Sequence, residues 1–286
     1  MRWIGRREST NVEDRRGMST GGMVAGGGIG AVIIAVIVAL LGGDPSEILQ
    51  GGGAGPNMGV QAPANQQADD QAAQFTRVVL ADTEDVWAKL FADHNARYRP
   101  PTLVMFRGVT ESGCGTASKA SGPFYCPLDQ KVYIDLSFYD ELARRFQAPG
   151  EFAMAYVIAH EIGHHIQNLE GTLDKVNAAR SRLSKRENNQ LSVRVELQAD
   201  FYAGVWAHHA QQMKNILEEG DIEAALRAAN AIGDDHIQQQ TQGTVVPDAF
   251  THGTSAQRMY WFKKGLQTGD LSQEDKLNSR EDADLQ

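Results

Sequence analysis

The sequence predicts an α+β protein, mainly helical with a small β-sheet, preceded by one transmembrane helix. Three observations predict this class: one long apolar run near the N-terminus, two short segments rich in β-branched and aromatic residues, and apolar residues at helical spacing through most of the second half of the chain. With 286 residues, of which 42% are hydrophobic and 22% charged, the chain can bury one sizeable core. The formal net charge of -9 argues against a nucleic-acid partner, because phosphate binding requires clustered Lys and Arg.

The apolar run extends from Met23 to Leu41 and contains no charged residue, no Asn and no Gln. As a helix it would be about 28 Å long, enough to cross the hydrocarbon layer of a membrane. Arginines precede the run, and Asp44 and Glu47 follow it. The positive-inside rule therefore predicts a single-pass protein with a cytoplasmic N-terminus and a periplasmic or extracellular C-terminal domain. A retained anchor is favoured over a cleaved signal peptide, because the run is long and no small-x-small cleavage site follows it.

The predicted organisation has five parts. They are a cytoplasmic N-terminus (1–22), the transmembrane helix (23–41), a flexible linker (42–74), the folded domain (75–270) and a polar, acidic tail (271–286). The linker is rich in Gly, Pro, Gln and Ala, a composition typical of chain that packs against nothing. The tail is expected to be disordered or a frayed helix.

The folded domain is expected to open with a helix over Phe75–Arg97, which Pro100 and Pro101 end. Residues 102–108 and 131–139 then predict two strands, because they are rich in β-branched and aromatic residues. The stretch Tyr125–Phe138, which includes the second strand, is either a core strand or an exposed sheet edge on which an extended substrate could lie as an added strand.

The loop between these strands carries Cys114 and Cys126, the only two cysteines of the chain. Both fall outside the cytoplasm on the predicted topology, where a disulfide between them would stabilise the fold by about 3 kcal/mol in the chain-entropy model. Two unpaired buried thiols are the alternative. Zinc ligation by the pair does not fit the spacing of a zinc knuckle.

A longer helix is predicted from Gly150 to Gly171, and it contains the pattern H-E-x-x-H at His160, Glu161 and His164. The two histidines are four residues apart, so both imidazoles leave one face of the helix and can reach one metal ion, while Glu161 can meet a water bound to that metal. By chance the pattern would occur in roughly 1% of shuffled sequences of this composition. Histidines satisfied within a core are the alternative, and that is the expected role of His165.

A catalytic zinc site usually takes a third protein ligand, and a second predicted helix offers one in "RVELQADFYAGVWAHH". Glu196 and Asp200 are four apart and share a face. Glu196 is expected to bind the metal and Asp200 to accept the spare ring N–H of a ligand histidine. A solvated acidic pair is the alternative, and His208 and His209 are second-choice ligands that would need another geometry.

The segments "AHEIGHHIQN", "ELQADFYAGVWA", "GDDHIQQQTQG" and "PDAFTHGTSAQRMYWFKKG" resemble the bacterial putative neutral zinc metallopeptidases, which are membrane-anchored proteins. The resemblance extends from the basic N-terminus to about Gly269. The H-E-x-x-H and E-x-x-x-D elements are similar to those of gluzincin metallopeptidases. This resemblance implies Zn²⁺ as the cofactor, with ligands His160, His164 and Glu196, the general base Glu161 and the orienting residue Asp200.

Two further residues complete the expected site. His252 stands on a Gly-containing loop before a helix that Thr254 or Ser255 can cap, and it is the expected donor to the oxyanion that forms during hydrolysis. An exposed loop histidine is the alternative. Arg258 is expected to form an ion pair with a buried acid near the site.

These residues predict a membrane-anchored zinc metallopeptidase that acts on a peptide or protein substrate. The alternative is a catalytically silent, zinc-stabilised binding or scaffold module of the cell envelope. Glu161 favours the enzyme, because a purely structural zinc site has no use for an acid beside the metal.

Overall fold

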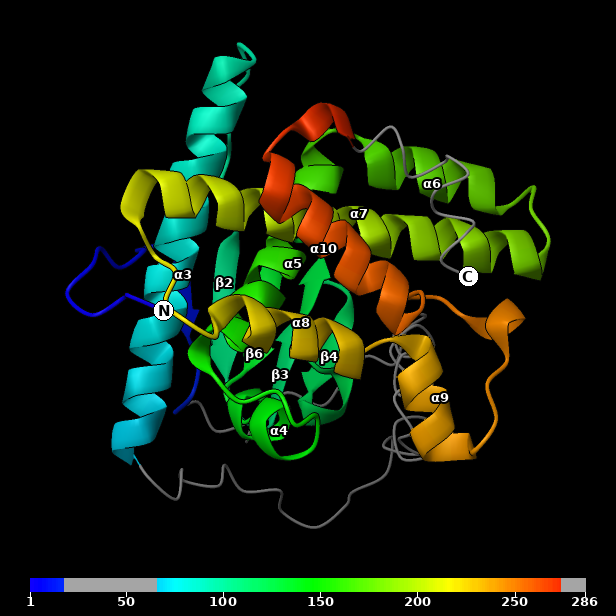
Figure 1. Ribbon diagram of the computed structural model, residues 1–286, viewed down its shortest axis with the longest axis horizontal. Helices are drawn as coiled ribbons and strands as arrows, with labels where there is room; N and C mark the ends of the chain where they lie inside the picture. Colours follow the sequence, from blue (N-terminus) through cyan, green and yellow to red (C-terminus); the bar gives the residue numbers. More distant parts are fainter. Residues whose placement is uncertain (18–65, 274–286) are drawn as a thin grey trace.

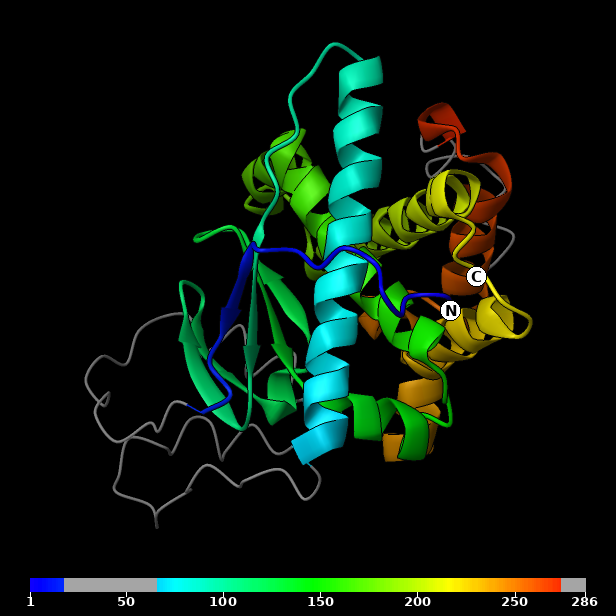
Figure 2. The ribbon, with the colours of Figure 1, turned by 90° about the vertical axis from the view of Figure 1, so that its left-hand side faces the viewer.

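The structure is a computed structural model that describes residues 1–17 and 66–273, and within them it confirms a mainly helical α+β fold with a small sheet. Figure 2 shows the strands on one side of α3 and most of the other helices on its opposite side. The elements, in chain order, are β1 (Val12–Asp14), α3 (Gln66–Asp93), β2 (Thr102–Phe106), β3 (Val109–Ser112), β4 (Gly115–Ser118), η1 (Lys119–Ser121), β5 (Phe124–Cys126), β6 (Lys131–Asp135), α4 (Phe138–Arg144), α5 (Glu151–Leu169), α6 (Thr172–Arg180), α7 (Lys185–Lys214), α8 (Asp221–Ala231), α9 (Asp234–Gln242), η2 (Pro247–Ala249) and α10 (Ser255–Thr268).

The main sheet has four strands in the order β1-β2-β6-β5. β1, β2 and β6 are parallel and β5 is antiparallel to β6, while β3 and β4 form a separate hairpin. The two predicted strands are present as β2 and β6, but β6 ends at Asp135 because Phe138 begins α4. β6 is an internal strand, with Ile134 in the main core and Tyr133 in a smaller one, so the core-strand alternative holds for it.

The N-terminal residues belong to this fold. Val12 and Asp14 are paired with Leu103 and Met105 of β2, and the blue segment in Figure 2 runs across α3 before it joins the sheet. Trp3 is 5% exposed and packs edge-on against Phe75 of α3, with ring centroids 5.5 Å apart. The prediction that residues 1–22 form a segment separate from the folded domain is therefore wrong for residues 1–17.

The predicted linker also extends too far. α3 begins at Gln66, nine residues before the predicted start of the domain, and Asp69 in its first turn is 3% exposed. Asp69 accepts hydrogen bonds from Arg16 (2.7 Å) and from Arg107 (2.8 Å), which explains why an acidic residue is buried there. Because this first turn is buried, residues 66–74 belong to the domain. The prediction that they are part of the linker is wrong.

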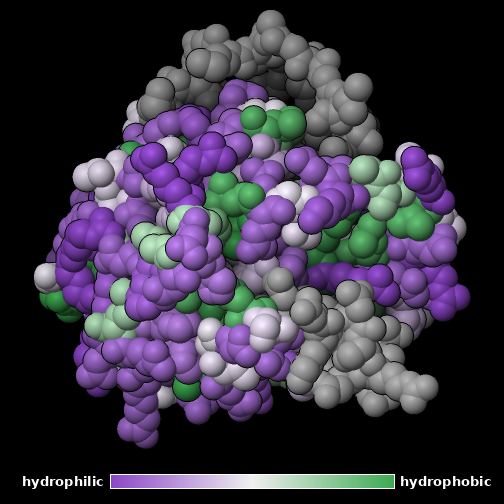
Figure 3. All heavy atoms as spheres, turned by 90° about the horizontal axis from the view of Figure 1, so that it is seen from above, coloured by the Kyte–Doolittle hydropathy of each residue, from purple (hydrophilic) through white to green (hydrophobic). Residues whose placement is uncertain are grey.

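The predicted transmembrane helix at Met23–Leu41 lies outside the described residues, as do residues 42–65 of the predicted linker and the tail from residue 274 onward. Among residues 1–17 and 66–273, no helix has both the length and the apolar character needed to cross a membrane. The face of the molecule in Figure 3 is mostly hydrophilic, with hydrophobic residues in separate patches.

Glycines allow the helices of the core to approach closely. A Cβ on Gly204 of α7 would lie 2.1 Å from the carbonyl oxygen of Phe262, and a Cβ on Gly265 of α10 would lie 2.1 Å from that of Phe201. The backbones of α7 and α10 are therefore in contact, a spacing that only glycine permits at these two positions. This crossing, visible in Figure 1, fixes where side chains of α10 reach α7.

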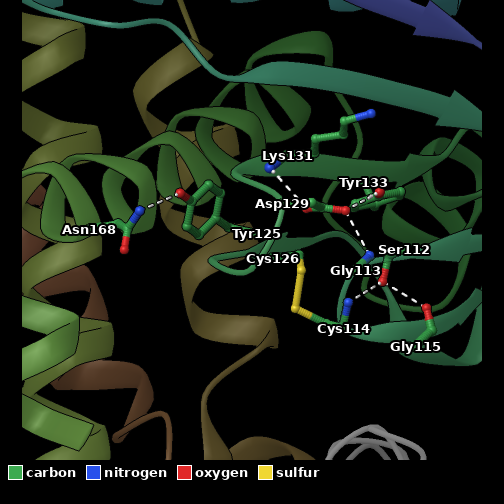
Figure 4. The surroundings of a disulfide bond; sticks show 10 residues. All are labelled: Ser112, Gly113, Cys114, Gly115, Tyr125, Cys126, Asp129, Lys131, Tyr133 and Asn168. Carbon is green, nitrogen blue, oxygen red and sulfur yellow. Dashed lines mark hydrogen bonds between the residues drawn. A yellow bond between two sulfur atoms is a disulfide. The ribbon is translucent and has the colours of Figure 1, made fainter.

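Cys114 and Cys126 are bonded to each other, with Cα atoms 5.8 Å apart. The bond joins the β3–β4 turn to the end strand β5, as Figure 4 shows. Asp129 strengthens the same junction, because its Oδ2 accepts hydrogen bonds from Gly113 N and from Tyr133 Oη, each at 2.7 Å. The disulfide and the Gly113–Asp129 hydrogen bond thus hold the hairpin turn to the main sheet, and Tyr133 of β6 fixes the position of Asp129.

Candidate metal centre

The candidate metal ligands come from two crossing helices, α5 and α7. α5 occupies Glu151–Leu169, close to the predicted Gly150–Gly171, and nearly all of its residues before His164 are buried. At Gly163, between the two histidines of the motif, an added Cβ would lie 2.9 Å from the carbonyl oxygen of Ala199. The glycine thus allows α7 to approach α5 closely at Ala199, which lies between Glu196 and Asp200.

Three side chains converge where these helices cross. His160 Nε2 lies 3.2 Å from Glu196 Oε2, and His164 Nε2 lies 3.6 Å from Glu196 Oε1. One ligand atom from each residue lies within 4.8 Å of the other two. Two ligands that are each about 2.1 Å from a tetrahedral zinc ion are about 3.4 Å apart, so the two histidine–glutamate distances of 3.2 and 3.6 Å are close to the value that such an ion requires.

Asp200 lies behind His160 and is completely buried. Its Oδ1 is 2.8 Å from His160 Nδ1 and accepts a 2.5 Å hydrogen bond from Tyr156 Oη. Arg258 of α10 binds both oxygens of the same carboxylate, with Nε 2.8 Å from Oδ2 and Nη2 3.0 Å from Oδ1. The predicted ion pair of Arg258 with a buried acid is confirmed, and this network leaves Nε2 of His160 facing Glu196.

Gln167 orients His164 in the same way, and the sequence reasoning missed it. Its Oε1 lies 2.8 Å from His164 Nδ1, and its Nε2 donates to the carbonyl oxygen of Val195 (2.7 Å) and to Gln198 Oε1 (2.8 Å) of α7. The signal was available, because Gln167 follows His164 by three residues and therefore shares its helix face. Each histidine of the motif thus has one ring nitrogen fixed and the other directed at Glu196.

The electrostatics of the cluster favour positive charge at the histidine rings. Burial would raise the pKa of Asp200, but the positive charges of Arg258 and His160 lower it to about 2. Burial would likewise raise the pKa of Glu196, but the charge of His164 and a hydrogen bond from His160 hold it well below its usual range. Burial lowers the pKa of His160, but the charge and hydrogen bond of Asp200 and the hydrogen bond to Glu196 raise it to about 10. A field that favours a proton on the ring also favours a divalent cation bound to the neutral ring.

Glu161 and His252 lie beside this cluster. Glu161 is 7% exposed, and its charge contributes to raising the pKa of His164 on the next turn of the helix. The side chain of His252 is 26% exposed. Burial lowers the pKa of His252, but the hydrogen bond to Asp234 and the charge of Glu196 raise it. The ring is therefore close enough to Glu196 for the two groups to interact electrostatically.

Asp234 holds the loop of His252 and was also missed from the sequence. Its Oδ1 lies 3.1 Å from His252 Nδ1, while its Oδ2 accepts hydrogen bonds from the backbone amides of Thr251 and His252, each at 2.6 Å. Thr254 caps α10 with a reciprocal capping box to Gln257, as expected for this loop. With Nδ1 held by Asp234, the other ring nitrogen, Nε2, is the one available for a ligand.

The remaining histidines near the motif are structural. His208 and His209, the second-choice ligands, lie at the other end of α7, where their rings contact the carbonyl oxygens of Leu266 (2.8 Å) and Gly269 (2.9 Å) near the C-terminus of α10. They are therefore not part of the centre. His165 is 1% exposed, as expected for a packing residue, and its ring joins α5 to Tyr125 of β5 and to Arg99.

The hydrogen bonds of His165 fix the tautomer of its neutral ring. The carbonyl oxygen of Arg99 can only accept, so Nε2 carries the hydrogen of this 2.7 Å bond, and Nδ1 accepts from Tyr125 Oη at 3.0 Å. Tyr125 Oη in turn accepts a 3.0 Å bond from Asn168 Nδ2, drawn in Figure 4. Burial lowers the pKa of His165 to about 4.

This buried neutral histidine predicts acid sensitivity. Between its unfolded pKa of about 6.5 and its folded pKa, the unfolded chain binds a proton that the folded chain does not, so stability falls as the pH falls. We expect a loss of about 1.4 kcal/mol per pH unit from pH 6 to 4.5. Urea unfolding at several pH values should show this slope in the wild type and in the control His94→Gln, whose ring is exposed. An equal slope in His165→Gln would contradict the assignment.

The chain is similar to one protein family and to uncharacterized proteins of bacteria. The family described as "Putative neutral zinc metallopeptidase" matches residues 1–277. The uncharacterized protein YpfJ of Escherichia coli K12 is 49% identical over 289 residues, which cover 96% of this chain and 97% of that protein. The uncharacterized protein Rv2575 of Mycobacterium tuberculosis H37Rv is 46% identical over 183 residues, 60% of this chain and 61% of that protein. No solved structure matches the chain.

Proposed function

Since the chain belongs to the putative neutral zinc metallopeptidase family, we propose that it is a zinc-dependent metallopeptidase that hydrolyses peptide bonds of a peptide or protein substrate. The observation that carries the proposal is the convergence of one ligand atom each from His160, His164 and Glu196 within 4.8 Å of one another, with Glu161 next to His160 on α5. Three protein ligands leave a fourth position for water, as hydrolytic zinc sites require.

The residues around the centre have complementary tasks. When bound, zinc would lower the pKa of a coordinated water towards about 7. Glu161 would take the proton of that water and deliver it to the leaving amine, since it follows His160 directly on the inner side of α5. His252, held by Asp234, would donate a hydrogen bond to the oxyanion of the tetrahedral intermediate.

The experiment compares the purified full-length protein with Glu161→Gln. Both should bind close to one zinc per chain, because the ligands are unchanged, while hydrolysis of a quenched-fluorescence peptide library should fall by about 10²- to 10⁴-fold in the variant. A chelator should abolish the wild-type activity and added zinc should restore it. Equal activity in the two proteins would exclude Glu161 as the base, and full zinc with no hydrolysis in either would favour the zinc-stabilised binding module.

His252→Ala tests the donor role in the same assay. It should keep the zinc content of the wild type and lower kcat by about 10²- to 10³-fold, the usual loss when one oxyanion donor is removed. A change in zinc content, with kcat preserved at saturating zinc, would instead make His252 a ligand.

We also propose that the protein is attached to a membrane, with its domain in the periplasm or outside the cell. The apolar composition of Met23–Leu41 supports attachment without fixing how the segment enters the bilayer, because a run of this kind favours lipid over water. The disulfide Cys114–Cys126 supports an oxidising compartment for the domain.

A further inference from the structure

The N-terminal residues and the domain are held together by a continuous set of contacts. β1 is hydrogen-bonded along β2, and the pairing extends beyond the strand through Leu103 N to Asn11 O (2.9 Å) and Arg15 N to Met105 O (2.7 Å). Backbone pairing of this kind requires that both segments share one folding environment, because a strand cannot pair through a membrane.

The residues before β1 contact three parts of the domain: α3, the start of α5 and the chain just after α7. Arg6 Nη2 is 2.7 Å from Asp82 of α3, and Ser9 Oγ donates a 2.5 Å hydrogen bond to Glu84 of the same helix. Trp3 Nε1 donates to Glu151 at the start of α5 (2.8 Å), and Arg2 N donates to the carbonyl oxygen of Ile216 after α7 (2.8 Å). Glu84 is 8% exposed, and Arg7 (3.1 Å) and Asn11 (2.7 Å) bind it together with Ser9, so these partners of a buried acid all come from the N-terminal segment. Asp82 is 1% exposed and is shared between Arg6 and Lys214 of α7 (2.9 Å).

The described residues on either side of the segment 18–65 lie near the start of α3. Arg16 is next to the last described residue before that segment, and its Nη1 is 2.7 Å from Asp69 and 3.0 Å from Asp70 in the first turn of α3. Gln66 begins α3 one turn before Asp70. Chain that leaves at Gly17 therefore returns at Gln66 on the same end of α3.

We infer that residues 1–17 and 66–273 occupy the same compartment, on one side of any membrane to which the protein is attached. A single crossing at Met23–Leu41 would place β1 and β2 on opposite sides of the bilayer and would break the sheet. The arginines that suggested a cytoplasmic N-terminus have another role: Arg6, Arg7 and Arg16 each pair with acidic residues of α3. This inference goes beyond the peptidase proposal and does not depend on it.

Cysteine labelling in intact cells tests the inference. Ile4 is 85% exposed in the N-terminal segment and Met213 is 42% exposed on α7, so Ile4→Cys and Met213→Cys place a reactive thiol on each part of the full-length chain. A membrane-impermeant maleimide should label both variants, or neither, before permeabilisation, and both afterwards. The unsubstituted chain, whose two cysteines are bonded, is the background control. Labelling of one variant and protection of the other in intact cells would overturn the inference.

A stability measurement tests the docking itself. Arg16→Glu brings a like charge to Asp69, which is 3% exposed, and should lower the thermal midpoint of the full-length protein by several degrees. Arg186→Glu is the matched control, because Arg186 and its partner Asp248 are each 66% exposed at the side chain. Equal midpoints for Arg16→Glu and the wild type would show that residues 1–17 are not docked, and would also overturn the inference.

Discussion

Glu196→Ala is expected to abolish tight zinc binding, whereas Asp200→Asn is expected to retain zinc with affinity weakened by about 10- to 100-fold. The geometry gives the reason: Glu196 faces Nε2 of both His160 and His164, while Asp200 reaches only Nδ1 of His160. The first residue would contribute a ligand atom and the second would orient one. His160→Ala and His164→Ala should lose zinc in the same way as Glu196→Ala.

Metal analysis after dialysis against a competing chelator measures this difference. His209→Ala is the control and should keep a full complement of zinc, because its ring contacts the carbonyl oxygen of Gly269, away from the centre. An empty site in Asp200→Ala, together with full zinc in Glu196→Ala, would reverse the two roles.

Arg258→Met is expected to lower the free energy of unfolding by about 3 to 5 kcal/mol, because it leaves the buried carboxylate of Asp200 without its permanent cation. Arg258 is 2% exposed and Asp200 is 0% exposed, so water cannot replace the lost partner. Urea denaturation gives the measurement. Lys263→Met is the matched control on the same helix, and since Lys263 is exposed it should change stability by at most about 0.5 kcal/mol.

A double-mutant cycle separates the ion pair from general packing. If the pair acts as a unit, Asp200→Asn combined with Arg258→Met should be less destabilising than the sum of the single changes. Strict additivity would mean that the two side chains stabilise the protein independently, contrary to the geometry.

The sequence predicted which helices carry the candidate ligands better than it predicted the surrounding fold. α5 could be predicted because its apolar residues recur at helical spacing around a metal-binding pattern, and Glu196 and Asp200 because a four-residue spacing fixes a shared helix face. These signals are local. Gln167 was missed although its signal was local too, because a glutamine beside a histidine has no distinctive chemistry without its second contact on α7.

The missed features depend on long-range contacts. β1 has three residues, "VED", too few for any periodicity, and its partner strand begins at Thr102. Arginines near an apolar run fit the positive-inside rule, and only the structure shows that Asp69 and Asp82 are buried beneath two of them. Asp234 likewise lies eighteen residues before His252, at a helix start where an acidic residue also serves as a favourable first-turn charge.

The contacts of the N-terminal residues also determine when folding can be completed during synthesis. Arg2 Nη1 bonds to the carbonyl oxygen of Asn215, a contact that spans 213 positions. At the usual 5 to 20 residues per second, Asn215 is added roughly 10 to 40 s after Arg2, and it then has to leave the ribosome. Arg2 and its neighbours thus remain without their final partners until Asn215 has been added, so the fold must be completed late, through contacts of high sequence separation that form slowly.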